Sequence, residues 1–306
     1  MIDEVEGELP EVTVVCLCYN QALYVSQALD SVHAQHYPNV SLVIVDNAST
    51  DGSHRVIEDW LAEHPDFPAT YLPQKENLEI CRGFNVGWRA GSGRYCIDLA
   101  ADDILLPERI ALGVRELEEL GEEYGVHFTD SQSISTEGQP MANFFWGRSL
   151  PEGDVYTQVV AATCIPTPSL MFRRSMLEAL GGYDESLHYE DFDIMVRAAR
   201  DWQFKGWPEV LVYKRVVPGS KINQRDQAET PYMLTTARVC ERIESLNRTE
   251  EEHRALRARV DYELREALRV GHRGAVQILA PLSRRLKPRT WKSAVVERWA
   301  RLYYHL

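Results

Sequence analysis

The chain has 306 residues, of which 44% are hydrophobic, and a formal net charge of -13 at pH 7. This hydrophobic content can fill one large core, which excludes disorder of the whole chain, and the length suits a catalytic domain with a smaller appendage. The acidic balance argues against a nucleic-acid binder, because a protein that neutralises a phosphate backbone needs clustered Lys and Arg.

The N-terminal sequence MIDEVEGELP lacks the basic start and the apolar core of a secretory signal. No apolar run approaches the roughly 18 residues that would span a bilayer. We therefore expect a cytoplasmic protein. Its six cysteines are scattered without a CxxC pair, so we expect reduced thiols in the core, not disulfides or a zinc site.

Apolar strands and amphipathic helices are expected to alternate over the first half of the chain. Residues 12–18 form an almost continuous apolar, β-branched run, which is typical of a parallel strand buried on both faces. The expected strands are 12–18, 41–45, 71–73 and 94–99. The expected helices are 22–36, 53–62, 83–90 and one that begins at Pro107. This order predicts a mostly parallel α/β sheet flanked by helices.

The second half has a less regular pattern around a loop-rich stretch at 137–165. Strands are expected at 126–129 and 169–172, and helices at 173–180 and 191–200. From about residue 237 the composition shifts to Glu, Arg, Leu and Ala, which is typical of helices.

Polar residues follow three of the expected strands: Asn20, the turn at 46–51, and the pair Asp102 and Asp103. Ligands of open α/β sheets bind beyond the carboxyl ends of the strands, so these residues predict one shared site. Two adjacent acids repel one another unless a cation is present, and Mg²⁺ or Mn²⁺ completed by diphosphate oxygens suits them. A solvated helix start, where the helix dipole favours Asp, is the alternative.

Two other features carry both a functional and a structural interpretation. The turn at 46–52 offers hydrogen-bond groups for a base or a ribose, although Asx and Ser residues also populate turns by bonding to their own backbone. Glu190 and Asp191 precede a helix, where a carboxylate accepts backbone N–H bonds and stays ionised, as a catalytic base must. The same pair also suits simple helix capping.

Taken together and in this order, five segments resemble family 2 glycosyltransferases, which have the GT-A fold. The resemblance covers roughly residues 11–220. Its carriers are VTVVCLCYN, LVIVDNASTDGS, Asn77 with Asn85 and Gly87, RYCIDLAADDILLPERI, and GGYDESLHYEDFDIMVRAARDW. The resemblance implies a Rossmann-like GT-A sheet flanked by helices. The implied domains are a catalytic domain at 1–220, with a donor half at about 11–130 and an acceptor half at 131–220, and a C-terminal helical region at 221–306.

By this resemblance, the chain would transfer a sugar from a UDP- or dTDP-sugar to a hydroxyl of a saccharide or lipid-linked acceptor, with inversion, in polysaccharide, lipopolysaccharide or glycolipid assembly. Tyr19 and Asp46 would contact the nucleobase. Asp102 and Asp103 would hold Mn²⁺ or Mg²⁺ with the diphosphate. Asp191 would be the base, with Glu190 able to exchange roles with it. The expected donor-binding residues are Leu17, Tyr19, Asn20, Asp46, Asn47, Arg82, Ala101 and Asp102.

Three positions depart from the family pattern. Ala100 stands where the family usually has Asp, Leu17 where it often has Pro, and Phe84 where it often has Arg. Arg82 would restore a diphosphate contact if it faces the site. A non-catalytic nucleotide-sugar binder is one alternative function. A nucleotidyltransferase is another, but residues 18–22 lack the glycines of a phosphate loop.

The last 24 residues, 283–306, carry seven basic side chains and one acid, with apolar residues at helical spacing. This pattern suits contact with an anionic membrane surface. Packing on the chain's own domain or on a second subunit in a homodimer is the slightly favoured alternative. In the middle loop, Phe144, Phe145 and Trp146 are candidates for stacking on an acceptor sugar or for pinning the loop.

Overall fold

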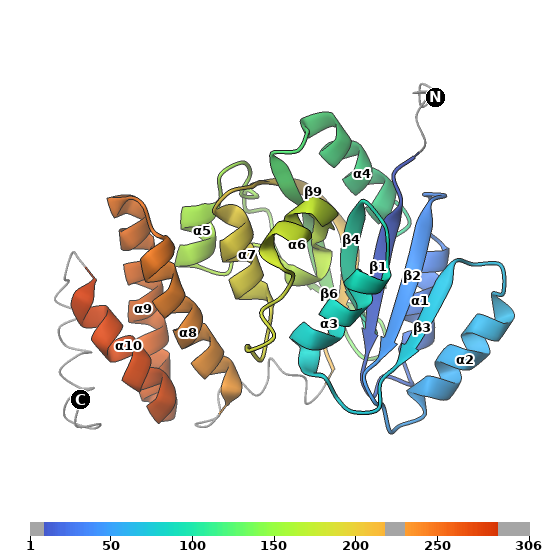
Figure 1. The fold of residues 1–306 in the computed structure, drawn as a ribbon, viewed down its shortest axis with the longest axis horizontal. Coiled ribbons are helices and arrows are strands. Elements are labelled where there is room, and N and C mark those ends of the chain that lie inside the picture. Colours follow the sequence, from blue (N-terminus) through green and yellow to red (C-terminus); the bar gives the residue numbers. More distant parts are fainter. Residues whose placement is uncertain (1–8, 218–229, 287–306) are drawn as a thin grey trace.

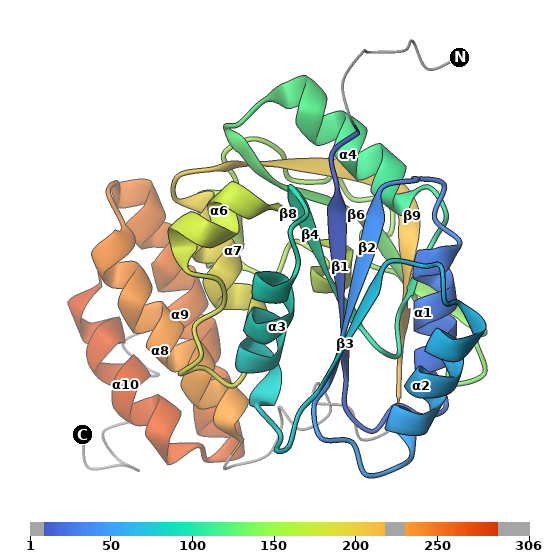
Figure 2. The same ribbon diagram turned by 45° about the vertical axis from the view of Figure 1, so that its right-hand side comes forward.

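The computed structural model describes residues 9–217 and 230–286. In these ranges a single mixed sheet is covered by helices on both faces, and three C-terminal helices stand beside it (Figures 1 and 2). The sheet order is β3-β2-β1-β4-β8-β6-β9-β5, with β7 paired to β6. Most of the predicted basic tail, from residue 287 on, lies outside the described residues.

The first half is the parallel, alternating unit that the sequence predicts. Its strands are β1 (Val12–Cys18), β2 (Val40–Asp46), β3 (Ala69–Pro73) and β4 (Tyr95–Ala100). Its helices are α1 (Val25–His33), α2 (Ser53–Glu63), α3 (Glu79–Ala90) and α4 (Arg109–Leu120). The strands pair in parallel. Helices α1, α2 and α4 pack on one face of the sheet and α3 on the other, so β1 is buried on both sides.

The second half continues the sheet with mixed strand directions. Its strands are β5 (Ile104–Leu105), β6 (Tyr124–Ile134), β7 (Pro140–Asn143), β8 (Met171–Arg173) and β9 (Gln203–Arg215). Strand β8 is antiparallel to both β4 and β6, whereas β9 is parallel to β6. The predominance of parallel pairs therefore holds for the first half only. Strand β9 was not predicted, because Gly206 and Pro208 interrupt its apolar pattern.

The remaining helices cover the second half of the sheet and extend beyond it. They are α5 (Tyr156–Ala161), η1 (Thr167–Ser169), α6 (Arg174–Leu180), α7 (Asp191–Ala199), α8 (Pro231–Leu246), α9 (Glu250–Val270) and α10 (Arg273–Arg285). Helix α5 lies in the stretch expected to be loop. Helix α9 begins with a capping box between Thr249 and Glu252. The buried residues of α7, α8 and α9 belong to one continuous core with the α3 side of the sheet.

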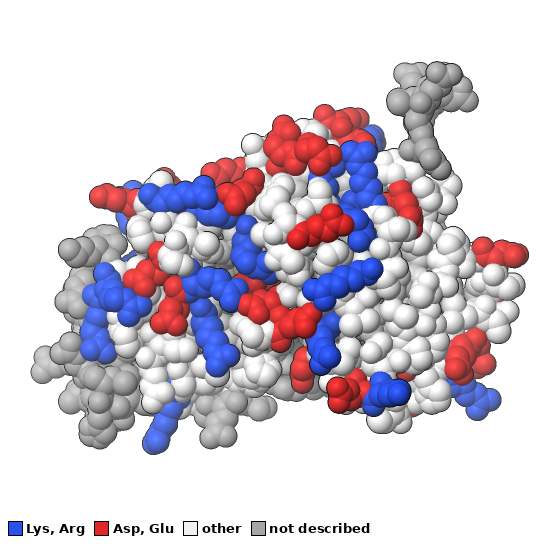
Figure 3. All heavy atoms as spheres, in the orientation of Figure 1, with Lys and Arg blue, Asp and Glu red and all other residues white. Residues whose placement is uncertain are grey.

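The thiols form no disulfide in the described residues, and the charged side chains on the face seen in Figure 3 show no special clustering. All six cysteines are free, and five of them are buried, whereas Cys164 is partly exposed. In Figure 3, acidic and basic side chains are interspersed on the visible face, without a large area of one sign. Within the described ranges, no helix has both the length and the apolar character needed to cross a bilayer.

Candidate functional site

The carboxyl ends of β1, β2 and β4 form one edge of the sheet, which we call the sheet rim (residues 19–20, 46–47 and 101–103). Cys18 pairs with Asp46, and Leu17 pairs with Ala100, so the three strands end side by side. The residues that follow each strand therefore emerge next to one another. The predicted convergence of three distant polar clusters is present in the fold.

Asn20 ties the first of these loops to the second. Its side-chain Oδ1 accepts a hydrogen bond from the Thr50 backbone at 2.7 Å, and its own N–H donates to Ser49 Oγ at 3.0 Å. Asn20 and Ala48 both have positive φ, at 55° and 63°. Non-glycine residues rarely adopt this conformation, and they do so more often at functional sites. The two loops therefore form one preorganised unit.

Asp46 and Asn47 are buried at the end of β2, at 4% and 3% exposure. Asp46 Oδ1 accepts from the Ser49 N–H at 3.0 Å, and Oδ2 accepts from the Tyr71 hydroxyl at 3.3 Å. Burial and the neighbouring Asp46 carboxylate raise the pKa of Tyr71, which keeps its hydroxyl a donor. Asn47 Oδ1 accepts from the Leu78 N–H at 2.7 Å. Both side chains thus shape the loops as well as lining the rim.

The acidic pair at the end of β4 divides between two environments. Asp102 is partly exposed, and its Oδ2 accepts from Gln21 Nε2 at 3.3 Å. Asp103 is only 4% exposed, and its Oδ1 accepts from the Arg215 N–H of β9 at 2.9 Å. Burial, followed by the adjacent Asp102 carboxylate, raises the pKa of Asp103 to about 8. Asp102 is therefore the more accessible carboxylate.

A divalent cation fits this arrangement only if the ligand supplies further oxygens. In the described ranges, no group of three or more His, Cys, Asp or Glu side chains could hold a metal by itself. Mg²⁺ and Mn²⁺ are commonly held by one or two carboxylates together with substrate phosphates and water. A partly exposed carboxylate at the rim, such as Asp102, provides that kind of ligand.

The other predicted donor-binding residues have different surroundings. Tyr19 is 46% exposed, and Ala101 is 1% exposed with its N–H bonded to Leu17 O at 3.2 Å. Leu17 packs closely under α3, because a Cβ on Gly83 would lie 2.8 Å from Leu17 Cδ1. Arg82 is exposed on α3. The arginine's charge helps to lower the pKa of Glu185, after hydrogen bonds from Asn85 and Arg89.

Phe84 is a core residue. It is fully buried, and its ring stacks on Tyr183 with 4.2 Å between the centroids. The Tyr183 hydroxyl in turn donates to Asp98 Oδ2 at 2.9 Å. The departure from the family pattern at this position therefore places an apolar ring between α3 and the segment at 181–190. The sequence does not predict the Asp98–Tyr183 bond, although an Asp within the apolar run at 95–99 is a signal of a buried acid.

The start of α7 lies at the same edge as the sheet rim. Strand β8 is antiparallel to β4, with Met171 opposite Ile97, so the residues before β8 lie beside the carboxyl end of β4. Thr167 is in that stretch, and its hydroxyl donates to Asp191 Oδ2 at 2.9 Å. The three distant regions that carry the predicted acids therefore meet at one side of the sheet. Thr167 has no sequence signal of its own.

Glu190 and Asp191 have different neighbours although they are adjacent. Asp191 contacts Thr167 and borders a small cavity of about 20 Å³ together with Phe192, Met195 and Arg259. Glu190 lies toward α3, because its charge is the largest contribution after burial to the raised pKa of Cys81. The structure brings both carboxylates to the region between α3 and η1.

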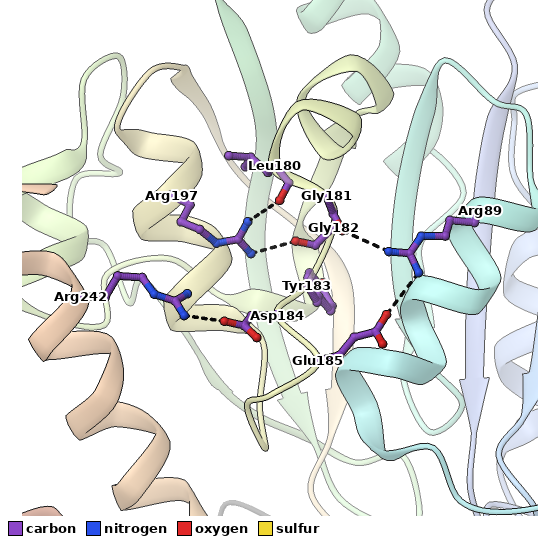
Figure 4. A pocket seen from close by; sticks show the side chains of 9 residues that line it. All are labelled: Arg89, Leu180, Gly181, Gly182, Tyr183, Asp184, Glu185, Arg197 and Arg242. Carbon is purple, nitrogen blue, oxygen red and sulfur yellow. Dashed lines mark hydrogen bonds and ion pairs between the residues drawn. The ribbon is translucent and has the colours of Figure 1, made fainter. Parts of the chain in front are cut away.

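A larger cavity of about 430 Å³ lies away from the rim, between α3 and the helices α7 and α8 (Figure 4). Its lining residues are Arg89, Leu180, Gly181, Gly182, Tyr183, Asp184, Glu185, Arg197 and Arg242. None of these is a predicted site residue. The charged side chains in it are paired with one another or with backbone carbonyls.

Comparison with known proteins identifies glycosyltransferases among the relatives. The family model "Glycosyl transferase family 2" matches residues 13–181. An uncharacterized glycosyltransferase of Nostoc sp. is 30% identical over 178 residues, which are 55% of this chain and 52% of the relative. The chain thus spans about half the length of that relative. The putative teichuronic acid biosynthesis glycosyltransferase TuaG of Bacillus subtilis is 25% identical over 166 residues, 54% of this chain and 63% of TuaG.

Solved structures share the fold at low sequence identity. Residues 1–349 of S. aureus TarS, in complex with UDP-GlcNAc, align with a TM-score of 0.69 and 14% identity, covering 96% of this chain and 91% of TarS 1–349. The mannosyltransferase PcManGT from Pyrobaculum calidifontis, in complex with GDP-Man and Mn²⁺, aligns with a TM-score of 0.64 and 18% identity, covering 96% and 81%. The fold is that of GT-A glycosyltransferases, as predicted. Since the family model matches more than half of the sequence, the chain belongs to glycosyltransferase family 2.

Proposed function

We propose that this protein is an inverting glycosyltransferase that moves a sugar from a nucleotide diphosphate sugar to a hydroxyl acceptor. The observation that carries the proposal is the position of Asp191 at the edge of the sheet where Asp46 and Asp102 also lie. One edge then offers groups for the nucleotide, for the diphosphate and for the acceptor proton. Membership of family 2 supports the same reaction class.

The nucleotide is assigned to the loops after β1 and β2. Tyr19 is exposed for contact with the base, and Asp46 and Asn47 line the rim beside it. Asn20 and Leu17 support these loops, and Arg82, exposed on α3, is the proposed cation for the diphosphate. UDP- and dTDP-sugars are the proposed donors. TarS with UDP-GlcNAc and PcManGT with GDP-Man support a nucleotide diphosphate sugar as the class of donor.

Mn²⁺ or Mg²⁺ is the proposed cofactor, with Asp102 as its protein ligand and Asp103 as a second candidate. When bound, such an ion neutralises negative charge on the departing diphosphate. The complex of PcManGT with Mn²⁺ supports this choice. Ala101, buried and bonded to Leu17 O, fixes the backbone that presents Asp102.

Asp191 is the proposed general base. The acceptor oxygen forms a bond to the anomeric carbon while the bond from that carbon to the diphosphate oxygen breaks, and the acceptor proton passes to Asp191 Oδ1 or Oδ2. A single displacement of this kind inverts the configuration and needs one carboxylate. The Thr167 hydroxyl, donating to Asp191 Oδ2, holds the carboxylate in one orientation. Glu190 is the alternative base.

Cell-surface polysaccharide, lipopolysaccharide or glycolipid assembly is the proposed setting. The name of TuaG, a putative teichuronic acid biosynthesis enzyme, supports it. A cytoplasmic location, with contact to the inner face of the membrane or dimerisation through the C-terminal region, belongs to the same proposal. A lipid-linked or saccharide acceptor would suit that location.

A thermal-shift panel of UDP, dTDP, GDP and ADP, each with and without MnCl₂, tests the donor site. We expect a metal-dependent rise in Tm with UDP or dTDP. Release of nucleotide diphosphate from the corresponding sugar donors then tests catalysis. Metal-dependent binding without turnover of any donor would favour the alternative function, a non-catalytic nucleotide-sugar binder.

A further inference from the structure

The segment at 181–190 connects α6 to α7 and ends at Asp191, and on one side it is held by α3. The Asn85 side-chain amide donates to Tyr183 O at 2.8 Å and accepts from Tyr183 N–H at 3.0 Å. Arg89 donates to Gly181 O at 3.3 Å and to Glu185 at 3.2 Å (Figure 4). A side chain at Gly182, where φ is 79°, would collide with Asn85. The contact with α3 is therefore close.

On its other side the same segment is held by α8. The His188 N–H donates to Thr235 Oγ1 at 3.1 Å, and the Tyr189 hydroxyl lies 2.6 Å from Thr236 Oγ1. Helix α8 belongs to the C-terminal helices, whereas the family match ends at residue 181. This half of the support therefore comes from a region beyond the matched part of the chain.

Arg242 of α8 connects the segment to the first turn of α7. Its Nη2 lies 2.5 Å from Asp184 Oδ2, and its Nη1 lies 2.5 Å from Asp193 Oδ1. Asp193 is 2% exposed, and its second oxygen accepts from Arg197 Nε at 2.6 Å. Asp184 precedes Asp191 in the segment, and Asp193 follows it in the first turn of α7. One guanidinium thus spans the stretch that contains Asp191.

The carboxylates of these ion pairs are partly or fully removed from water, with side-chain exposures of 23% for Asp184 and 2% for Asp193. Although burial opposes it, hydrogen bonds from Arg242 and Ser186 lower the pKa of Asp184 to about 2. A carboxylate as buried as Asp193 is costly to keep ionised without cationic partners. The Arg242 side chain itself remains 39% exposed, so it does not fill core volume. Arg242 therefore acts through its ion pairs with Asp184 and Asp193 more than through packing.

We propose that Arg242 is a positioning residue that sets the orientation of Asp191 through Asp184 and Asp193. The proposal rests on the proposed function, in which Asp191 is the base. Asp191 and Asp193 lie in the same helical turn, so movement of one displaces the other. A displacement of about 1 Å at a reacting group can reduce a rate by about 100-fold. Helix α8, one of the C-terminal helices, then helps to hold the proposed base in its position.

The first test needs no substrate. Amide hydrogen exchange is measured on the full chain for the parent, Arg242→Gln and Arg285→Gln. Arg285 is the matched control, because it also pairs with α8, through Glu244 at 2.8 Å, but does not touch the segment. We expect exchange over 184–194 to become about 10-fold faster in Arg242→Gln only. Equal exchange in the two variants would overturn the proposal.

The second test uses the sugar donor identified by the nucleotide-release assay, with water or an acceptor as the second substrate. For Arg242→Gln we expect kcat to fall by about 10- to 100-fold with the donor KM within about twofold of the parent. Arg242→Lys should recover part of the rate, since Lys keeps the charge but cannot reach both acids with a planar fork. Combined with Asp191→Asn, Arg242→Gln should cause no further loss, because the base is already absent.

The outcomes separate this proposal from the function on which it rests. If the parent turns over no donor, the proposed function fails, whereas hydrogen exchange still decides whether Arg242 orders the segment. If the parent is active and Arg242→Gln matches it, the positioning role is wrong. If Arg242→Gln lowers kcat in the Asp191→Asn background as much as it does in the parent, its effect is a general structural one. That result would also overturn the positioning role.

Discussion

The sheet rim and the segment at 181–190 are ordered by different means. The rim consists of loops that follow adjacent parallel strands, and they bond to one another, as Asn20 does to Thr50. The segment at 181–190 follows a short helix and is held from two sides by α3 and α8. The residues proposed to bind the nucleotide thus lie at the ends of the sheet's own strands, whereas the proposed base depends on elements far away in the sequence. Distant substitutions should therefore affect the base more than the rim.

The comparison predicts its largest effect at Asp191. Asp191→Asn preserves size and the hydrogen bond from Thr167 but removes the base, so transfer should fall by about 10²- to 10⁴-fold. Donor affinity should stay within about twofold of the parent, since the rim is untouched. Rates and a calorimetric donor Kd check both parts. Glu190→Gln is the control: if it loses transfer while Asp191→Asn retains it, the base is Glu190.

The acidic pair at the rim should separate into a ligand and a structural residue. Asp102→Asn should weaken Mn²⁺-dependent donor binding by about 10- to 100-fold, because a charged interaction is worth about 1.5–3 kcal/mol. Asp103→Ala should also weaken donor binding if Asp103 shares the cation. In addition it leaves the Arg215 N–H without its acceptor, and we expect a loss of about 1–3 kcal/mol in the free energy of unfolding.

Calorimetry with and without MnCl₂, alongside urea denaturation, measures both quantities for the two variants. If Asp103→Ala loses metal dependence at unchanged stability, Asp103 is the principal ligand. If Asp102→Asn binds the donor with the parent's affinity, the Asp102 carboxylate is not a ligand of the cation.

The same contrast explains what the sequence predicts. Strand β1 was predicted at its observed bounds, because its apolar run signals a parallel strand. Residues at the rim were found because each directly follows such a strand. The residues that hold Asp191 and the segment before it are not predicted: Thr167, Thr235 and Arg242 act through contacts across 24 to 58 positions of the chain. No local pattern records a contact of that range, and β9 was missed because Gly206 and Pro208 break its pattern.

The Tyr183 hydroxyl links the segment at 181–190 to Asp98 of β4, and the burial of Asp98 makes stability pH-dependent. Burial raises the pKa of Asp98 to about 7, above an unfolded value of about 3.9. Below about pH 4 both states are protonated. As the pH rises from 4 to 7 the unfolded chain ionises first, so this group lowers stability across that window and the loss is complete above it.

Asp98→Asn should remove that dependence while keeping an acceptor for Tyr183. Since Asp98 is not fully shielded from solvent, we expect the variant to gain about 1–2 kcal/mol over the parent at pH 8 and less at pH 5. Urea denaturation at the two pH values provides the measurement. Asp59→Asn, an exposed acid on α2, is the control. A gain of the same size at both pH values would contradict the assignment.

The smallest expected effect lies on the acceptor side, at Trp146. Phe145 is 4% exposed and its N–H donates to Asp130 Oδ1 at 3.0 Å, whereas Trp146 is 75% exposed with a φ of 45°. Phe145 therefore pins the loop, and the indole remains available. Asp130 lies near the level of Ala100, because Met171 of β8 faces both Ile97 and His127. The loop is thus anchored near the edge of the sheet that carries the rim.

Trp146→Ala should raise the acceptor KM by about 2- to 12-fold, the equivalent of an aromatic contact worth about 0.5–1.5 kcal/mol. Donor Kd and Tm should remain those of the parent, because neither the rim nor the core contains this side chain. Trp146→Phe should retain most of the acceptor affinity through its ring. Transfer kinetics at saturating donor, across a panel of octyl glycosides as acceptors, make the comparison. An unchanged acceptor KM would show that Trp146 does not contact the acceptor and that the aromatic residues at 144–146 only hold the loop in place. A changed donor Kd would show that Trp146 belongs to the rim.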